Sequence, residues 1–383
     1  MAFGGHEIHD KCASVRKVDG QTARAMDWPA LDYAKFLCVV GMVLAHGFFW
    51  TWTVAGRFLL PPESPWFSAF QFGTFLGFFP LTLPLLAGAS YRLRLGATRS
   101  SIPALLWRCS LLAVVGYAMN VLAAGWYTVW AWNVLQLVAL AFLVIEALYV
   151  RGSVWWIAVL ALLILVLNDP LHAWFPPGMR GPFLRVVLGD DSDWHTWPVF
   201  PWLATVAAGF VLAHGYQSVS NRAMFTRTGA IAGVVLLVVA VVAGQALPPF
   251  DPQNLIGPRM MVPPMAAILG LLGVALLLLS ALTAVQGRLH FSPYGIVSCF
   301  SAGILWIYVI HMIVGVRLSR WIFSYVYPGD VVADPWQGWH PFILFGFPIL
   351  LVLVSWLVGY IVVRGLHGKR LSVRLRKVAV NAV

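Results

Sequence analysis

The stretch "LDYAKFLCVVGMVLAHGFFW" (residues 31–50) decides the fold class of this chain. It is almost wholly apolar, and its charged or imidazole side chains are Asp32, Lys35 and His46. A helix of twenty residues rises about 30 Å, which is the thickness of the hydrocarbon core of a bilayer. The stretch therefore predicts a transmembrane helix, on which His46 lies roughly 20 Å beyond Asp32.

The rest of the chain repeats this pattern. Of its 383 residues, 60% are hydrophobic and 10% are charged, whereas soluble domains are about 25% charged. That scarcity of charge excludes a water-soluble globular enzyme. The apolar runs have the length of membrane-spanning helices and lack the alternation of barrel strands. They predict an all-α, polytopic transmembrane bundle of about ten spans, near residues 33–53, 68–91, 102–124, 128–150, 153–168, 197–216, 228–246, 263–286, 295–316 and 341–363.

The Lys and Arg residues set the expected orientation. With an even number of spans, most of the 25 fall on the side that holds both ends of the chain. Because basic residues favour the cytoplasmic side, both termini are expected there, and the net charge of +11 implies no nucleic-acid partner. The chain then divides into a cytoplasmic N-terminal segment (1–32), the bundle (33–363) and a basic cytoplasmic tail (364–383). The polar first thirty residues are unlike a cleavable signal peptide.

The cysteines give no sign of a disulfide framework or of a metal site. They lie far apart and form no CxxC pair, so no bound metal is expected. The four are Cys12, Cys38, Cys109 and Cys299.

Histidines inside the spans are functional candidates, because an ionisable side chain is costly to place in hydrocarbon. His46 in the first span and His311 in "GILWIYVIHMIVGV" both fall in the outer half of outward-running spans, so together they can form one site. Each can instead be a hydrogen-bonded bundle histidine, and His214 near the inner end of its span suits an interfacial role. Two polar side chains of the fourth span, Asn133 and Gln136, are expected to join helices, and Glu146 falls near the inner interface.

Basic residues at the inner ends of two spans suggest a phosphate site. Arg92, Arg94 and Arg99 follow the second span, and clustered arginines bind phosphate through paired contacts. Lys35 adds a cation near the start of the first span. The alternative is that the arginines are positive-inside anchors and that Lys35 snorkels to the interface.

Several segments resemble the membrane-bound acyltransferases, which include the acyltransferase 3 family and the heparan-alpha-glucosaminide N-acetyltransferase family. "ALDYAKFLCVVGMVLAHGFF" resembles their opening helix, in which a basic residue, ten residues and a histidine follow one another, as Lys35 and His46 do. "FFPLTLPLLAGAS" is similar to their second helix, and "WPVFPWLATVAAGFVLAHG" to a helix of the N-acetyltransferase branch. "SAGILWIYVIHMIV" resembles a late helix of both, so the likeness runs from about residue 30 to 316.

The resemblance implies an integral membrane acyltransferase that uses cytoplasmic acyl-CoA, most simply acetyl-CoA. Lys35 and the three arginines would bind the donor phosphates. His46 would act as general base, or would carry the acyl group covalently, and His311 would orient it or polarise the carbonyl. The acceptor would be a hydroxyl or amine of a glycan or lipid-linked glycan on the outer side. Three long loops are expected there (169–196, 247–262 and 317–340), and the tryptophans of the first and third can stack on a sugar.

Two other classes of function stay open at this point. A bundle with broken helices and intramembrane Lys and His residues also suits a small-molecule or lipid transporter. Two histidines at similar depth can also ligate a haem in a non-catalytic subunit of a membrane complex. The bilayer is the expected surrounding, with a bacterial inner membrane as the location, and a homo-oligomer or a larger complex stays possible.

Overall fold

The computed structural model describes residues 28–54, 81–95, 101–124, 128–150, 153–189, 197–245, 262–289, 292, 294–326 and 340–380. Within these ranges the regular elements are helices, which confirms the predicted all-α fold. Two are short 3-10 turns, Pro177–Met179 and Gln286–Arg288. The α-helices are α2 (Pro29–Val54), α4 (Leu83–Leu95), α5 (Ile102–Leu122), α6 (Val134–Val150), α7 (Val154–Trp174), α8 (Pro182–Leu188), α9 (Val199–Ser218), α10 (Arg222–Gln245), α11 (Met265–Val285), α12 (Ile296–Val326) and α13 (His340–Val380).

Helix lengths identify an integral, multi-pass membrane protein. Eight helices of the described part are long and apolar enough to cross a bilayer, and Val134–Val150 is a shorter apolar helix. Each of the ten predicted spans coincides with one of the described helices. Most of the second predicted span, before α4, lies outside the described residues.

Several predicted boundaries were wrong. The ninth span was predicted to end at residue 316, but α12 continues to Val326, so residues 317–326 of the predicted loop 317–340 are helical. The fourth span was predicted to start at residue 128, but α6 starts at Val134. The fifth span was predicted to end at residue 168, but α7 continues through Pro170 to Trp174. Its exposed Trp155 and Trp174 are 19 residues apart, which on a helix is about 28 Å, as expected for aromatic side chains at the two membrane interfaces. The last span was predicted to end at residue 363, but α13 runs on to Val380, because Arg, Lys and Leu in the tail are good helix formers.

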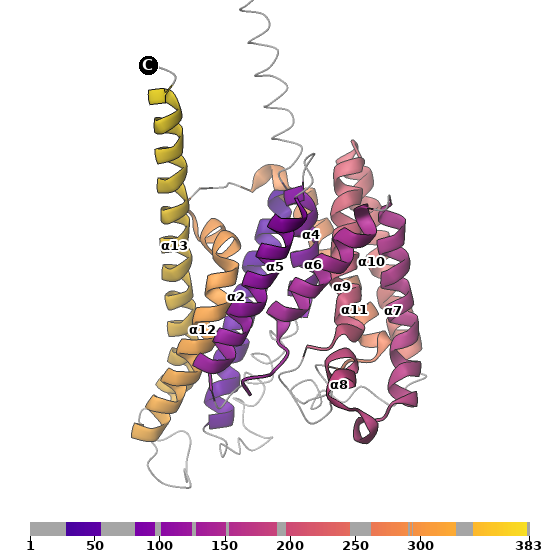
Figure 1. The fold of residues 1–383 in the computed structure, drawn as a ribbon, viewed down its shortest axis with the longest axis horizontal. Coiled ribbons are helices and arrows are strands. Elements are labelled where there is room, and N and C mark those ends of the chain that lie inside the picture. The colour runs from indigo at the N-terminus through magenta and orange to yellow at the C-terminus, as the bar shows by residue number, and fades with distance from the viewer. Residues whose placement is uncertain are drawn as a thin grey trace, which may run out of the picture.

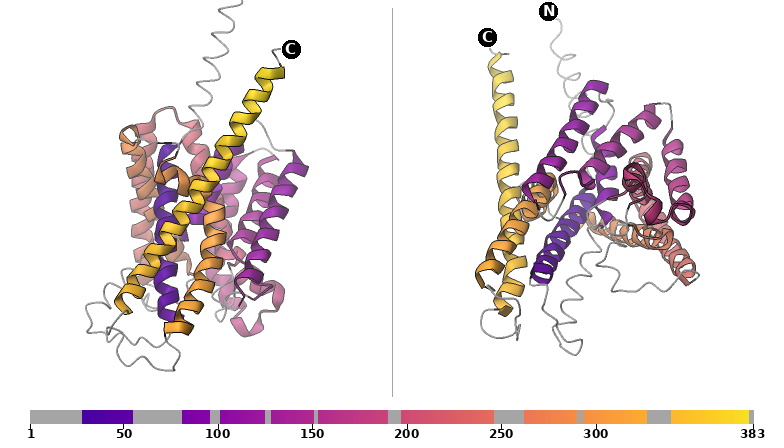
Figure 2. Two further views of the ribbon diagram at one scale, coloured as in Figure 1. Left: turned by 90° about the vertical axis from the view of Figure 1, so that its left-hand side faces the viewer. Right: turned by 60° about the horizontal axis from the view of Figure 1, so that its bottom comes forward.

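The bundle has α2 near its middle. α12 and α13 pack against α2 on one flank, and Figure 2 shows α13 leaning across them. On the other flank α4 lies against α9, and α10 lies along α11, with α7 outermost (Figure 1). The start of α2 and the end of α13 lie at the same end of the bundle (Figure 1).

Glycines allow the closest helix contacts. A Cβ at Gly88 of α4 would lie 2.8 Å from the carbonyl carbon of Val206, and one at Gly209 of α9 would lie 2.7 Å from that of Leu85. The same device recurs between α12 and α13, where a Cβ at Gly303 would lie 2.8 Å from the Cα of Gly359. Small residues suit a membrane interior. Lipid is as apolar as the side chains, so there is no hydrophobic driving force between helices, and close backbone packing has to stabilise their association.

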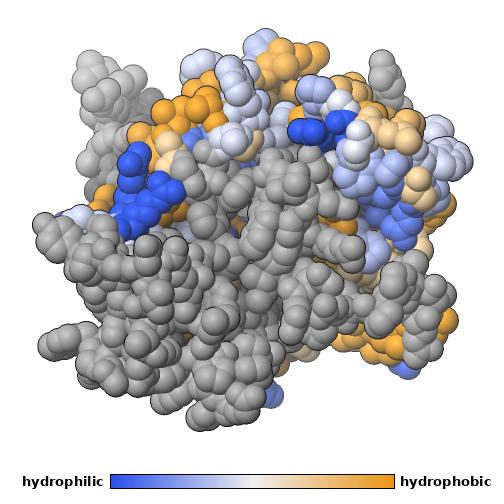
Figure 3. All heavy atoms as spheres, turned by 90° about the horizontal axis from the view of Figure 1, so that it is seen from below, coloured by the Kyte–Doolittle hydropathy of each residue, from blue (hydrophilic) through white to orange (hydrophobic). Residues whose placement is uncertain are grey.

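α10 has an apolar exposed face. It exposes a run of valines, including Val234, Val238 and Val242. A continuous apolar face of that kind matches a hydrocarbon surrounding. Figure 3 views the end of the bundle at which α2 ends, where hydrophilic side chains stand beside apolar ones.

Candidate active site

α2 and α12 form a parallel pair that runs through the centre of the candidate site (Figures 1 and 2). From one contact to the next, the residue numbers rise together on both helices, as in a parallel pair with a constant register. In order, the contacts join Lys35 to Ser301, His46 to His311, and Trp50 to Gly315. The pair therefore carries a polar node at one end and the two histidines toward the other.

The structure brings His46 and His311 together. Nδ1 of His46 lies 2.9 Å from Nε2 of His311, and Nδ1 of His311 lies 2.8 Å from the carbonyl oxygen of Ile307. A carbonyl only accepts, so Nδ1 of His311 must donate to it. With both rings neutral, Nε2 of His311 then accepts from Nδ1 of His46. The remaining nitrogen, Nε2 of His46, is left with its lone pair available.

The two rings lie among aromatic and apolar side chains. His311 is 1% exposed, whereas His46 is partly exposed. Trp50 stacks beside His46 with ring centroids 5.3 Å apart, and Tyr308 meets His311 edge-on at 5.7 Å. Within the described residues, Nε2 of His46 has no hydrogen-bond partner, so it is the nitrogen able to meet a substrate. The direct contact between the two imidazoles leaves no room for a haem between them.

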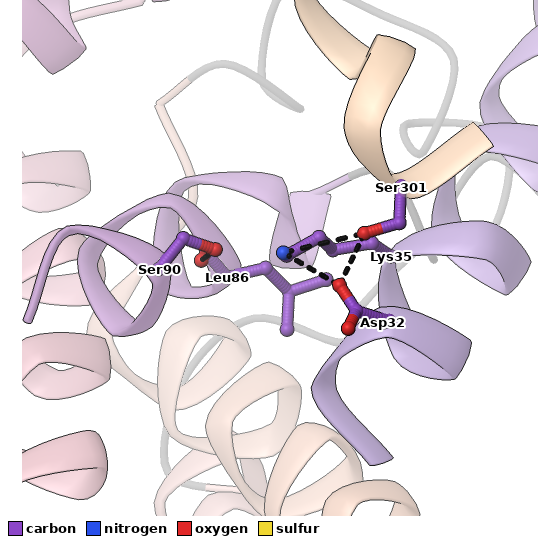
Figure 4. Close-up of polar contacts among 5 residues, drawn as sticks. All are labelled: Asp32, Lys35, Leu86, Ser90 and Ser301. Atoms are coloured by element: carbon purple, nitrogen blue, oxygen red, sulfur yellow. Dashed lines mark hydrogen bonds and ion pairs between the residues drawn. The ribbon is translucent and has the colours of Figure 1, made fainter. Parts of the chain in front are cut away.

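Lys35 forms a polar node with Asp32 and Ser301 (Figure 4). Its Nζ lies 3.1 Å from Oδ1 of Asp32 and 3.4 Å from Oγ of Ser301, and the Ser301 hydroxyl donates to the same Asp32 oxygen. Leu86 of α4 lies beside this node, and the hydroxyl of Ser90 donates to the Leu86 carbonyl oxygen at 2.7 Å (Figure 4). Lys35 is therefore paired with a carboxylate and tied to α12, which the sequence alone did not indicate.

The arginines of α4 occupy different surroundings. Arg94 is exposed, and its charge acts on that of Lys35. Arg92 is buried, with Nε and Nη2 at 3.3 and 3.2 Å from Nδ1 of His214. Arg99 lies outside the described residues. Lys35, Arg92 and Arg94 thus lie toward the same end of the bundle, and the histidine pair lies further along α2.

The comparisons with known proteins bear on this arrangement. The family model for the catalytic region of heparan-alpha-glucosaminide N-acetyltransferase matches residues 28–250, more than half of the chain. The chain belongs to this family. No curated protein and no solved structure matches it.

Membership in the N-acetyltransferase family identifies the chain as a membrane acyltransferase enzyme. The matched range contains Lys35, His46, Arg92 and Arg94, and it is the N-acetyltransferase branch of the resemblance that is found. His311 lies beyond that range, on α12. Its place in the candidate site comes from the hydrogen bond to His46.

Several residues of the site region were missed or read too simply in the sequence. Asp32 and Ser301 are small polar residues in apolar runs, and their only signal was a polar side chain placed inside a span. His214 was read as interfacial, yet it contacts a buried arginine. Glu146 accepts a hydrogen bond from Tyr91 at 3.0 Å, which joins α6 to α4.

Asn133 joins helices, as predicted for the fourth span, whereas the hydrogen bond of Gln136 stays at the start of α6. Nδ2 of Asn133 donates to the carbonyl of Gly116 at 3.1 Å and to Oδ1 of Asn120 at 2.9 Å, so α5 is tied to the start of α6. Oε1 of Gln136 accepts from the Asn133 backbone at 3.2 Å. At the far end of α12, Arg317 and Arg320 donate to carbonyls at the end of α5. These contacts tie α5 to α6 at one point and to α12 at another.

Proposed function

We propose that this protein transfers an acetyl group from acetyl-CoA to an amine or hydroxyl of a sugar-containing acceptor. The donor binds at the end of the bundle where α2 begins, and the acceptor enters from the opposite end. The family supports the chemistry, and the distribution of basic residues supports a cytoplasmic donor side with both termini there. A bacterial inner membrane is the location proposed.

The basic side chains near the start of α2 support binding of the donor at that end of the bundle. Lys35, Arg92 and Arg94 supply positive charge near the start of α2, and Arg99 is proposed as a further phosphate contact. His46 is eleven residues beyond Lys35, so it lies about 17 Å along the helix. That separation is comparable to an extended phosphopantetheine arm. Phosphates held at the cations would therefore place the thioester near the imidazole pair.

The observation that carries the proposal is the hydrogen-bond chain from Ile307 through His311 to His46. In this hydrogen-bond chain Nδ1 of each histidine carries a proton, so Nε2 of His46 has a free lone pair and can accept a proton. When it does, the imidazolium that forms still donates from Nδ1 to His311. His311 therefore orients the base and stabilises its charged form, which is the task of the third member of a catalytic triad.

The transfer step follows from this arrangement. The acceptor nitrogen or oxygen attacks the thioester carbonyl carbon while its proton passes to Nε2 of His46. The tetrahedral intermediate collapses, the carbon–sulfur bond breaks, and the proton moves from His46 to the departing sulfur. The products are the acetylated acceptor and free CoA thiol, and His46 returns to its neutral form.

A His46→Asn variant tests the base. The asparagine amide can still donate to His311, but nothing replaces Nε2. In proteoliposomes given radiolabelled acetyl-CoA and a glucosamine-terminated acceptor, we expect transfer to fall roughly 10²- to 10⁴-fold, the usual contribution of a general base. Binding of acetyl-CoA, measured by calorimetry, should be retained. Transfer at the wild-type rate would overturn the assignment.

Matched variants of His311 test the orienting role. Gln at position 311 can present its amide oxygen where Nε2 stands, whereas Leu cannot. We expect His311→Gln to keep more activity than His311→Leu, and equal rates would remove His311 from the mechanism. Acid quenching after incubation without acceptor separates the two chemical routes. An acetylated His46 at that point would replace general-base catalysis by a covalent intermediate.

A further inference from the structure

Arg92 is a buried cation whose donors are only partly used. It is 9% exposed, and its guanidinium carbon lies 5.6 Å from the ring centroid of Tyr149 and 5.9 Å from that of Phe210. Among the described residues, no carboxylate lies within ion-pair distance of Arg92. Glu146 accepts a hydrogen bond from Tyr91. A buried charge without a counter-ion is costly, so an anion bound there would stabilise it.

His214 fixes the plane of this guanidinium. An arginine can only donate, so Nδ1 of His214 accepts from both Nε and Nη2 of Arg92, at 3.3 and 3.2 Å. The close packing of α4 on α9 at Gly88 and Gly209 brings the two side chains together. Two of the five N–H groups of Arg92 thus face His214. The other three have no hydrogen-bond partner within the described residues.

We infer that His214 is a positioning residue that aims Arg92 at a phosphate of the CoA donor. The inference rests on the proposed function and deepens it. The aromatic rings of Tyr149 and Phe210 contact each other and lie together on one side of the guanidinium, and His214 occupies one edge. The free edge is then presented in a fixed direction, and paired N–H donors suit phosphate oxygens. Exposed Arg94, two residues further on, adds positive charge nearby.

A donor without phosphates separates positioning from structure. S-acetylpantetheine has the same thioester as acetyl-CoA but lacks the nucleotide and its phosphates. We expect His214→Leu to raise KM for acetyl-CoA roughly tenfold, as the loss of an oriented charge-assisted contact would. Its kcat should change by less than about twofold, and kcat/KM for S-acetylpantetheine should be unchanged.

His214→Asn is the matched control, because its amide oxygen can accept near the position of Nδ1. It should restore most of the affinity for acetyl-CoA. Arg92→Lys keeps the charge but loses the planar fork, so it should raise KM for acetyl-CoA. Adding His214→Leu to the Arg92→Lys variant should then raise KM no further. If His214→Leu lowers kcat/KM equally with both donors, His214 is merely structural and the inference fails.

Calorimetric binding of CoA itself keeps the test independent of catalysis. We expect roughly tenfold weaker binding in His214→Leu and near wild-type binding in His214→Asn. Unchanged binding in the Leu variant would overturn the inference. If CoA binds in this pattern but no acceptor is acetylated, the proposed transferase activity fails while the assignment of His214 stands.

Discussion

Gly315→Ala should inactivate the enzyme by separating the two histidines. A Cβ at this position would lie 2.5 Å from Cη2 and 2.6 Å from Cε3 of Trp50. The ring cannot turn away, because Trp50 is fully buried. Cζ3 of Trp50 would lie closer still, so α12 must move from α2 by more than about 0.9 Å to reach the 3.4 Å of ordinary contact.

That displacement acts one turn from the candidate site. Gly315 follows His311 by four residues, and Trp50 follows His46 by four. Moving α12 by more than about 0.9 Å lengthens the 2.9 Å contact between the imidazoles to more than about 3.8 Å, which is no longer a hydrogen bond. A misplacement of about 1 Å can cost on the order of 10² in rate, and we expect a loss of that size in kcat.

The assay is acetyl transfer at saturating acetyl-CoA, with the melting temperature of the purified protein recorded beside it. Gly346→Ala is the matched control, since no described atom lies within 4 Å of a Cβ built there. It should leave both quantities unchanged. Because alanine is the better helix former, a loss at position 315 cannot come from helix propensity.

A second change in the same contact tests the cause. Trp50→Val removes the ring that the new methyl group would strike, so the double variant should recover part of the activity lost in Gly315→Ala. Wild-type activity and melting temperature in Gly315→Ala would refute the reasoning. So would a loss that Trp50→Val leaves unrelieved while the protein stays folded.

Other contacts give further predictions. Ser301→Ala should lower stability by about 1 kcal/mol through the loss of its hydrogen bonds at the Lys35 node, measured as a lower melting temperature. Gly209→Ala should prevent correct packing of α9 on α4, seen as loss of monodisperse protein in size-exclusion chromatography, because the new Cβ would strike the Leu85 carbonyl. For sidedness, Gly178→Cys should react with a membrane-impermeant maleimide in intact cells, whereas Gly287→Cys should react only after lysis. Both glycines have open surroundings, and the reverse labelling pattern would invert the proposed orientation.

Much of the fold could be predicted because the solvent imposes it. Inside a bilayer the backbone must satisfy its own hydrogen bonds, so a run such as residues 31–50 has little choice but a helix. Helix ends are less determined, as α7 and α13 show. Past Pro170 and past residue 363, tertiary packing and helix propensity extend a helix that hydropathy alone would end.

The candidate site was harder to predict, because its contacts join distant parts of the chain. Depth along a span can be counted from the sequence, and it put His46 and His311 at one level. Rotation about each helix axis and the choice of neighbouring helix cannot be counted in that way. Ser301 illustrates this point, since only the pairing of α2 with α12 brings it to Lys35 and Asp32, which already lie one turn apart on α2.

The pairing of α2 with α12 has to be set by polar contacts and by shape, and these are the same features that the proposed chemistry uses. In lipid, apolar side chains gain little by choosing one helix neighbour over another, so register depends on hydrogen bonds and small residues. The Lys35 node fixes the pair at one end, and Trp50 against Gly315 fixes it at the other. His46 and His311 lie between these two points. A slip of one residue would shift the helices by about 1.5 Å and turn the imidazoles apart, so the packing that stabilises the bundle also maintains the proposed base.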